Sequence, residues 1–107
     1  MLPSNVRVFI ASQPVDMRKS FDGLAVLIQT QFNKDVRSGH LFVFSNRKHD
    51  KIKVFFWDRN GHCMWYKRLA EGRFRLPRIS SSLGTISLSD LNLLLEGIDL
   101  THQQRLK

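Results

Sequence analysis

Positively charged and aromatic side chains are the residues best suited to chemistry in this sequence, and they gather in one stretch. Residues 51–78 hold eight of the 17 Lys and Arg residues and both tryptophans. Lysine and arginine displace the counterions of phosphate groups, and aromatic rings stack on nucleobases. This combination is typical of a nucleic-acid-binding surface, although a half-buried sheet with a basic outer face has the same composition.

We therefore predict a nucleic-acid-binding surface formed by the strands and loops of residues 47–78. The basic residues expected to meet phosphates are Arg47, Lys48, Lys51, Lys53, Arg59, Lys67, Arg68, Arg73, Arg75 and Arg78. The aromatic residues expected to stack on bases or line the groove are Tyr66 and, according to the strand register, either Trp57 or Trp65. Binding should depend little on base sequence, because the chain has no helix-turn-helix, zinc-finger or RNA-recognition signature.

The other reactive residue types offer no coherent catalytic or metal site. The four histidines are scattered and Cys63 is the only cysteine, which leaves no ligand set with zinc spacing. The carboxylates that could form a magnesium triad on paper are Asp16, Asp22, Asp58 and Glu96. Helix-end or surface positions explain Asp22 and Glu96 better, and the glycines match no phosphate-binding motif. We expect no enzymatic activity, no metal and no cofactor.

Hydrophobic periodicity predicts the elements that must position these side chains. The predicted strands are 6–11, 41–45, 51–58, 62–69 and 73–76, and the predicted helices are 20–32 and 90–98. The Ser- and Gly-rich stretch 79–87 is predicted as a connector that could end in a short edge strand. This order predicts an α+β fold, in which an antiparallel β-meander of about four to five strands carries two helices packed on one face.

The register of the hairpin around Asn60-Gly61 decides which aromatic residues share a face. If these two residues form the loop, the residues on the face of Trp57 are Met64, Tyr66 and Arg68. If the loop has three residues and a bulge, they are Cys63, Trp65 and Lys67. The sequence leaves both registers open. Along 51–58, the face that we expect to be exposed consists of Lys51, Lys53, Phe55 and Trp57.

Charge and size limit the partners and the domain organisation. The formal net charge is +8 and the isoelectric point is about 10.4, which favours a polyanion or an acidic protein as partner. We expect one α+β domain over 1–98 and a polar tail over 99–107. We expect no secretory leader, and no apolar run of the sequence is long enough to cross a membrane. We therefore predict a cytoplasmic protein without a membrane partner or a small-molecule substrate.

Four sequence blocks together resemble a known family, and the resemblance extends over residues 3–98. These blocks are PVDMRKSFDGL, GHLFVF, DKIKVFFWD and WYKRLAEGRF. They are similar to the TnpB accessory proteins of the bacterial insertion-sequence-66 transposons. That family accompanies a separate transposase and a small DNA-binding protein, and no catalytic residues are assigned to it. The resemblance implies a bacterial, nucleoid-associated, non-catalytic factor for DNA transposition, with DNA and the other proteins of the element as partners.

Two functions remain open at this point. The first is an accessory factor that binds DNA through the basic and aromatic sheet. The second is an interaction module that docks onto the transposase without contacting DNA. In that case a leucine stripe of the second helix could serve as the docking surface, although a core role for these residues is favoured. Its members are Leu91, Leu94 and Leu95.

Overall fold

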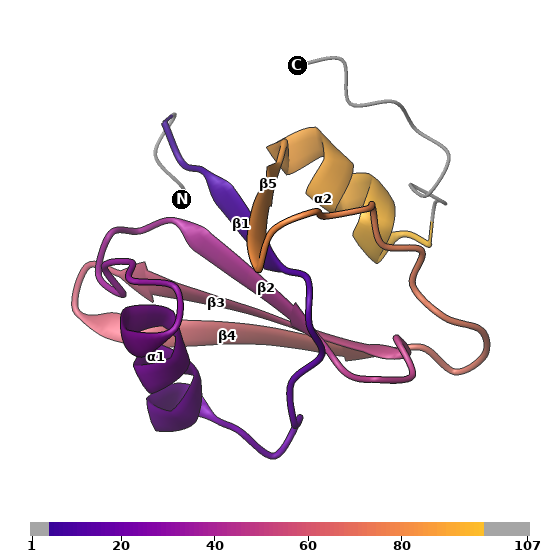
Figure 1. Cartoon of the computed structure of the whole chain (residues 1–107), viewed down its shortest axis with the longest axis horizontal. Coiled ribbons are helices and arrows are strands. Elements are labelled where there is room, and N and C mark those ends of the chain that lie inside the picture. The colour runs from indigo at the N-terminus through magenta and orange to yellow at the C-terminus, as the bar shows by residue number, and fades with distance from the viewer. Residues whose placement is uncertain (1–4, 98–107) are drawn as a thin grey trace.

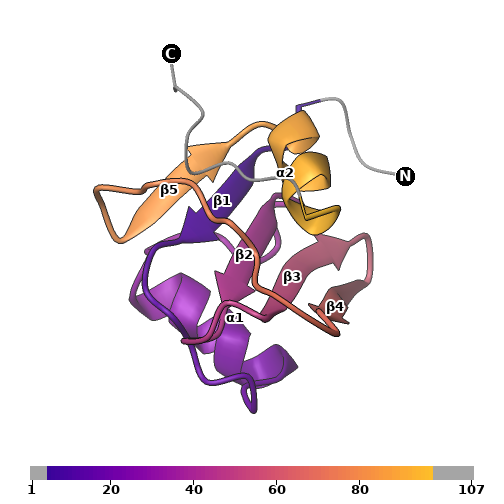
Figure 2. The same cartoon turned by 90° about the vertical axis from the view of Figure 1, so that its right-hand side faces the viewer.

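The polypeptide folds into a five-stranded β-sheet with one helix against each face (Figures 1 and 2). The structure is a computed structural model and describes residues 5–97. The strands are β1 (Val8–Ala11), β2 (Leu41–Ser45), β3 (Lys51–Asp58), β4 (Gly61–Arg68) and β5 (Leu83–Ile86). The helices are α1 (Phe21–Thr30) and α2 (Leu88–Leu95). The predicted polar tail, 99–107, lies outside the described residues.

The strand order is β4-β3-β2-β1-β5, and most neighbours pair antiparallel. β2, β3 and β4 form the predicted meander, and β5 is an edge strand that pairs antiparallel with β1. β1 and β2 run parallel, because the chain passes through α1 between them and returns to the end at which β1 starts. The α+β class is confirmed, and the sheet is mixed.

The two helices lie on opposite faces of the sheet, so the prediction that both pack on one face is wrong. α1 places Leu24 and Ile28 against the phenylalanines of one face, and α2 places Leu91 and Leu94 against the aliphatic residues of the other. Every residue of β1 and β2 is buried. These strands are apolar runs without polar alternation, as in sheets that are covered on both sides. One helix on each face provides this cover.

The β3 face that the sequence suggested to be exposed is the face that packs against α1. Phe55 is completely buried and Lys53 is 6% exposed. Phe55 belongs to the same hydrophobic cluster as Leu24 and Ile28 of α1. The predicted alternation of β3 is therefore present, but α1 excludes solvent from the central part of this face.

The β3–β4 turn consists of Arg59 and Asn60, one residue earlier than the predicted Asn60-Gly61 loop. Arg59 adopts a positive φ of 55°, and Trp57 pairs with His62. This register differs from that of an Asn60-Gly61 loop by two residues, so the side chains keep the same faces. The bulged alternative does not occur. The residues on the face of Trp57 are His62, Met64, Tyr66 and Arg68.

The segment 73–76 is not a strand, which corrects the sequence prediction. It crosses the end of the sheet and is attached there by Phe74, whose N–H donates to the carbonyl oxygen of His49 at 2.6 Å. The Phe74 ring is 1% exposed and belongs to the core on the α2 side. The alternation of basic and apolar residues in RFRL thus reflects one anchored aromatic ring between exposed arginines.

We expect each helix to contribute a core contact of similar weight. Leu24→Ala in α1 and Leu94→Ala in α2 should each lower the free energy of unfolding by about 2–5 kcal/mol, because both leucines are completely buried. Val26→Ala removes an exposed side chain of α1 and should change it by less than about 0.5 kcal/mol. Chemical denaturation measures all three variants. A neutral Leu94→Ala would contradict the packing of α2 as part of the core.

Candidate nucleic-acid interface

Positive side chains gather at the end of the sheet where β2 ends, β3 begins and β4 ends. Lys51 and Arg68 are register partners at this end. The turn 46–50 is joined to the segment after β4 by Leu69, whose N–H donates to the carbonyl oxygen of Asp50 at 2.8 Å. We call this region the basic end. Its Lys and Arg residues are Arg47, Lys48, Lys51, Arg68, Arg73, Arg75 and Arg78.

The turn 46–50 is held by the side chain of Asn46. Its Oδ1 accepts hydrogen bonds from the N–H groups of Asp50 and Lys51 at 3.1 and 3.0 Å. Its Nδ2 donates to a carboxylate oxygen of Asp50 at 2.6 Å, and this hydrogen bond is the main cause that lowers the pKa of Asp50. Because the turn is closed internally, Arg47 and Lys48 are free to extend into solvent, and both are exposed.

Acidic neighbours do not neutralise the basic end. The segments 46–51 and 68–78 contain seven Lys and Arg residues and only two acidic residues. Within residues 5–97, ion pairs join only Arg18 to Asp16 and Arg59 to Asp58. None of the seven cations of the basic end belongs to such a pair. Their charge is therefore available to an external anion.

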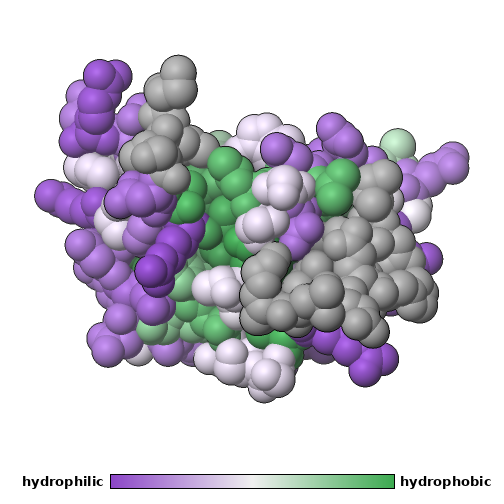
Figure 3. Space-filling view, turned by 90° about the horizontal axis from the view of Figure 1, so that it is seen from above, coloured by the Kyte–Doolittle hydropathy of each residue, from purple (hydrophilic) through white to green (hydrophobic). Residues whose placement is uncertain are grey.

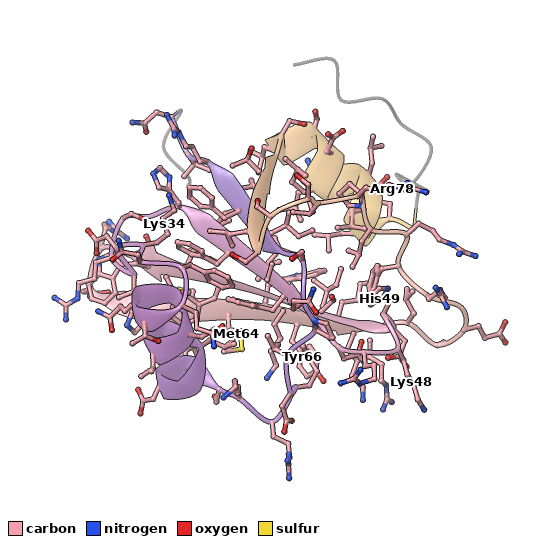
Figure 4. All side chains as sticks on the ribbon, viewed as in Figure 1. Lys34, Lys48, His49, Met64, Tyr66 and Arg78 are labelled. Carbon is pink, nitrogen blue, oxygen red and sulfur yellow. The ribbon has the colours of Figure 1, made fainter. Side chains whose placement is uncertain are left out.

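The basic end has two sides, which are separated by the sheet. On the α1 side, a groove of about 690 Å³ is lined by Arg18, Arg47, Lys48, Lys51 and Tyr66, among others. On the α2 side, a smaller hollow of about 230 Å³ is lined by residues that include His49, Arg73 and Arg75. Burial and the nearby charge of Arg73 lower the pKa of His49. Figure 4 shows Lys48, His49 and Arg78 at the same end of the molecule.

Two lysines of the predicted interface are engaged inside the fold. The Lys53 ammonium donates to the carbonyl oxygens of Met17 and Lys19, each at 2.7 Å, and burial lowers its pKa. The Lys67 ammonium donates to the carbonyl oxygen of Leu95 at 2.7 Å, at the C-terminal end of α2 where a cation is favourable. Both charges serve backbone carbonyls, and neither belongs to the basic end.

Arg59 and Trp57 lie at the opposite end of β3 from the basic end. Arg59 forms an exposed ion pair with Asp58 at 3.8 Å. The Arg37 guanidinium stacks on the Trp57 ring at 4.5 Å, and His62 meets that ring edge-on with 4.9 Å between the ring centroids. Trp57 is half-buried by these contacts. Of the ten basic residues predicted to meet phosphates, Arg59 alone therefore lies at the end of the sheet opposite to the basic end.

Tyr66 is the aromatic candidate that the fold places at the basic end. Its side chain is 51% exposed and lines the groove on the α1 side. Trp65 precedes it and points to the α2 side, where it is 41% exposed beside Leu91 and Leu95 of α2. In Figure 4, Tyr66 lies on the side of the sheet away from α2. The register thus places Tyr66 on the opposite face from Trp65 and on the same face as Trp57, which lies at the other end of β3.

Arg18 belongs to the groove, although sequence reasoning did not include it in the interface. Three hydrogen bonds from its guanidinium and one from its backbone N–H engage the Asp16 carboxylate, whose pKa they lower to about 2. The segment reaches the groove because the N–H of Val15 donates to the carbonyl oxygen of Ser45 at 2.9 Å. Local sequence carries no signal for this contact, since it joins segments that are distant along the chain.

Residues 5–97 contain no group of three or more His, Cys, Asp or Glu side chains placed to hold a metal ion. No helix in that range is long and apolar enough to cross a membrane. Cys63 is half-buried and free.

We expect Lys53 and Lys51, which share one face of β3, to respond differently to the same substitution. Lys53→Met should lower the free energy of unfolding by about 1–3 kcal/mol, because it leaves two carbonyl oxygens without their donor. Lys51→Met should change it by less than about 0.5 kcal/mol, since no partner among the described residues binds its ammonium. Chemical denaturation of both variants tests this, and equal effects would contradict the structural role of Lys53.

Comparisons with known proteins agree over nearly the whole chain. The model of the family described as IS66 Orf2 like protein matches residues 6–105. A relative from Sinorhizobium fredii (strain NBRC 101917 / NGR234), "Uncharacterized protein y4hO", is 42% identical over 106 residues, which cover 97% of this chain and 92% of the relative. A second relative from the same organism, "Uncharacterized protein y4jC", is 31% identical over 100 residues, which cover 94% and 86%.

No solved structure matches the chain. The family model and both relatives extend across both segments of the basic end. The resemblance noted from the four sequence blocks is therefore confirmed, and the chain belongs to the IS66 Orf2 like family.

Proposed function

We propose that this protein is a non-catalytic accessory factor of DNA transposition in the bacterial cytoplasm, and that its basic end binds DNA. Membership of the IS66 Orf2 like family implies an accessory role in transposition. The observation that carries the proposal is the group of seven Lys and Arg residues at one end of the sheet, none of them in an ion pair among residues 5–97. Their side chains extend from loops and strand ends, where they reach phosphates without disturbing the core.

The two sides of the basic end suit a backbone that passes across it. Arg47, Lys48 and Lys51 line the α1 side, whereas Arg73 and Arg75 line the hollow on the α2 side. Phosphates therefore meet cations on both sides of the sheet. Contacts of this type fix the position of DNA without selecting its sequence. The proposal keeps sequence-tolerant binding and omits Lys53 and Lys67, whose ammonium groups are engaged.

Absence of catalysis is part of the proposal. The accessory role of the family supports it, and so does the position of the carboxylates. Asp16 is held by Arg18 and Asp50 by Asn46, while Asp58 lies at the opposite end of β3. A magnesium-dependent nuclease would require such oxygens to converge on one point.

A salt series tests the DNA-binding proposal by fluorescence anisotropy with a labelled duplex. The logarithm of the binding constant should fall with the logarithm of salt concentration by about 0.9 per phosphate contact. Replacing Arg47, Lys48 and Lys51 by Ala should reduce this slope by about 0.9 for each phosphate that is no longer neutralised. Failure of the wild-type protein to bind at low salt would reject the proposal.

A matched control separates local binding from overall charge. Replacing Arg7, Lys34 and Arg59 by Ala also removes three positive charges, but at the opposite end of the sheet. Lys34 is labelled at that end in Figure 4. This variant should keep a slope close to that of the wild type. An equal decrease in both variants would show that DNA senses only the net charge, and the assignment of the basic end would then be wrong.

Docking onto the transposase is a second candidate, and an apolar hollow beside α2 favours it. The hollow has a volume of about 550 Å³ and is lined by Phe56, Trp57, Trp65, Leu91 and Leu95, among others. Figure 3 views the molecule from the α2 side and shows hydrophobic side chains gathered there. Leu91 is core, as the sequence favoured, whereas Leu95 is only half-buried. An exposed tryptophan beside such a hollow is typical of a protein-binding site.

Co-purification with the transposase of the element, after nuclease treatment, tests this second candidate. Docking predicts a nuclease-resistant complex that Trp65→Ser weakens at least about tenfold, because an interface tryptophan commonly contributes about 2 kcal/mol or more. The variant that lacks Arg47, Lys48 and Lys51 should still bind. A complex that dissociates when nucleic acid is digested would instead indicate bridging by DNA.

A further inference from the structure

The groove on the α1 side of the basic end has a composition that duplex phosphates alone do not require. Four cations line it: Arg18, Arg47, Lys48 and Lys51. Two carboxylates and an exposed aromatic ring line it as well, from Asp16, Asp50 and Tyr66. Its volume of about 690 Å³ lies within the range of about 300–1,000 Å³ that is usual for small-ligand pockets. The groove therefore has room for a nucleotide.

The Tyr66 ring is held in place from inside the protein. The Lys53 ammonium lies 4.9 Å from the ring centroid, and two carbonyl oxygens fix this ammonium at 2.7 Å each. Lys53 and Tyr66 are register partners on β3 and β4. Because this contact restrains the ring, a base that stacks on it should lose less of its binding energy to ordering the protein. About half of the side chain remains exposed.

The carboxylates of the groove make a bare phosphate a poor match and a nucleotide a better one. Arg18 holds the pKa of Asp16 near 2, and Asn46 lowers that of Asp50, so both groups are ionised at neutral pH. A carboxylate repels phosphate, but it accepts hydrogen bonds from the exocyclic amino group of a base. Cations for the backbone, a ring for the base face and carboxylates for the base edge are thus combined in one groove.

We infer that this groove binds single-stranded DNA, with one base stacked on Tyr66 and the adjoining phosphates on Arg47, Lys48 and Lys51. The inference rests on the proposed DNA binding and specifies which form of DNA enters the site. In a duplex both faces of each base are occupied by its stacked neighbours, so only an unpaired base can place its face on the ring. The remaining cations of the basic end would hold the backbone on either side.

The test compares three labelled probes of about 12 nucleotides, a length within the site sizes of single-strand binders. They are a single strand, the same strand with abasic sites at its centre, and a duplex. The single strand should bind about tenfold more tightly than the abasic strand. Tyr66→Ala should remove this difference and change binding of the abasic strand and the duplex by less than about twofold. Tyr66→Phe, which keeps the ring, should retain the difference.

Trp65→Ala is the matched control, because it removes the neighbouring ring on the other face of β4 and should leave all three probes unaffected. A second readout needs no variant. Tyr66 is the only tyrosine, so tyrosine-selective labelling gives a single set of ring signals in the NMR spectrum. The single strand should shift these signals upfield through the ring current of the base, and the abasic strand should not.

Three outcomes would overturn the inference, and they differ in what else they reject. Equal binding of the normal and abasic strands would reject base stacking and leave the proposed phosphate contacts intact. Loss of binding to all three probes in a folded Tyr66→Ala protein would show that Tyr66 shapes the basic end without stacking on a base. Failure of every probe to bind wild-type protein at low salt would reject the proposed function together with the inference.

Discussion

Burial of both faces of β1 and β2 is the constraint on which the other features of this fold depend. Neither strand has an exposed residue, so each face of the sheet needs its own cover. α1 and the loop after it cover the phenylalanine-rich face, while α2 and Phe74 cover the aliphatic face. Little of the sheet surface is left for a ligand. Apart from exposed residues of β4 such as Trp65 and Tyr66, the groups available to a partner therefore lie where strands end and loops begin, and the basic end is such a place.

The same constraint explains why lysines within the strands differ from those in the loops. A charged group that loses water must be supplied with polar partners. Lys53 finds them in the carbonyls of Met17 and Lys19, and Lys67 finds one at the last turn of α2. Both lysines thereby join strands of the β3–β4 hairpin to segments on opposite sides of the sheet. They contribute to the positive composition of the chain, but their role is to position its elements.

Local patterns predicted the elements well, because periodicity and turn residues act over short distances. The strands at 41–45 and 51–58 agree with β2 and β3 at both ends, and the faces in the β3–β4 hairpin agree with one of the two predicted registers.

The placement of elements that are distant along the chain could not be predicted from these local patterns. An apolar run such as LFVFS does not say whether one or both of its sides are covered, so the helices were assigned to one face. Charge clustering along the chain likewise did not separate Lys51 from Lys53, since the difference depends on the backbone of residues 17–19. Arg18 joins the groove through the contact of Val15 with Ser45, which no local pattern contains.

The layout of the two candidate surfaces bears on what an accessory protein can do. The groove and hollow of the basic end share no lining residue with the apolar hollow beside α2. Trp57 and Asp58 of that apolar hollow belong to the far end of β3, whereas Lys51 of the groove is its first residue. A partner on one surface would therefore leave the other accessible. Because β3 and β4 pair along their full length, the strands hold the two surfaces at a fixed separation. This arrangement is compatible with the proposed DNA contact at one end and the proposed docking surface near the other, where a catalytic partner would supply the chemistry.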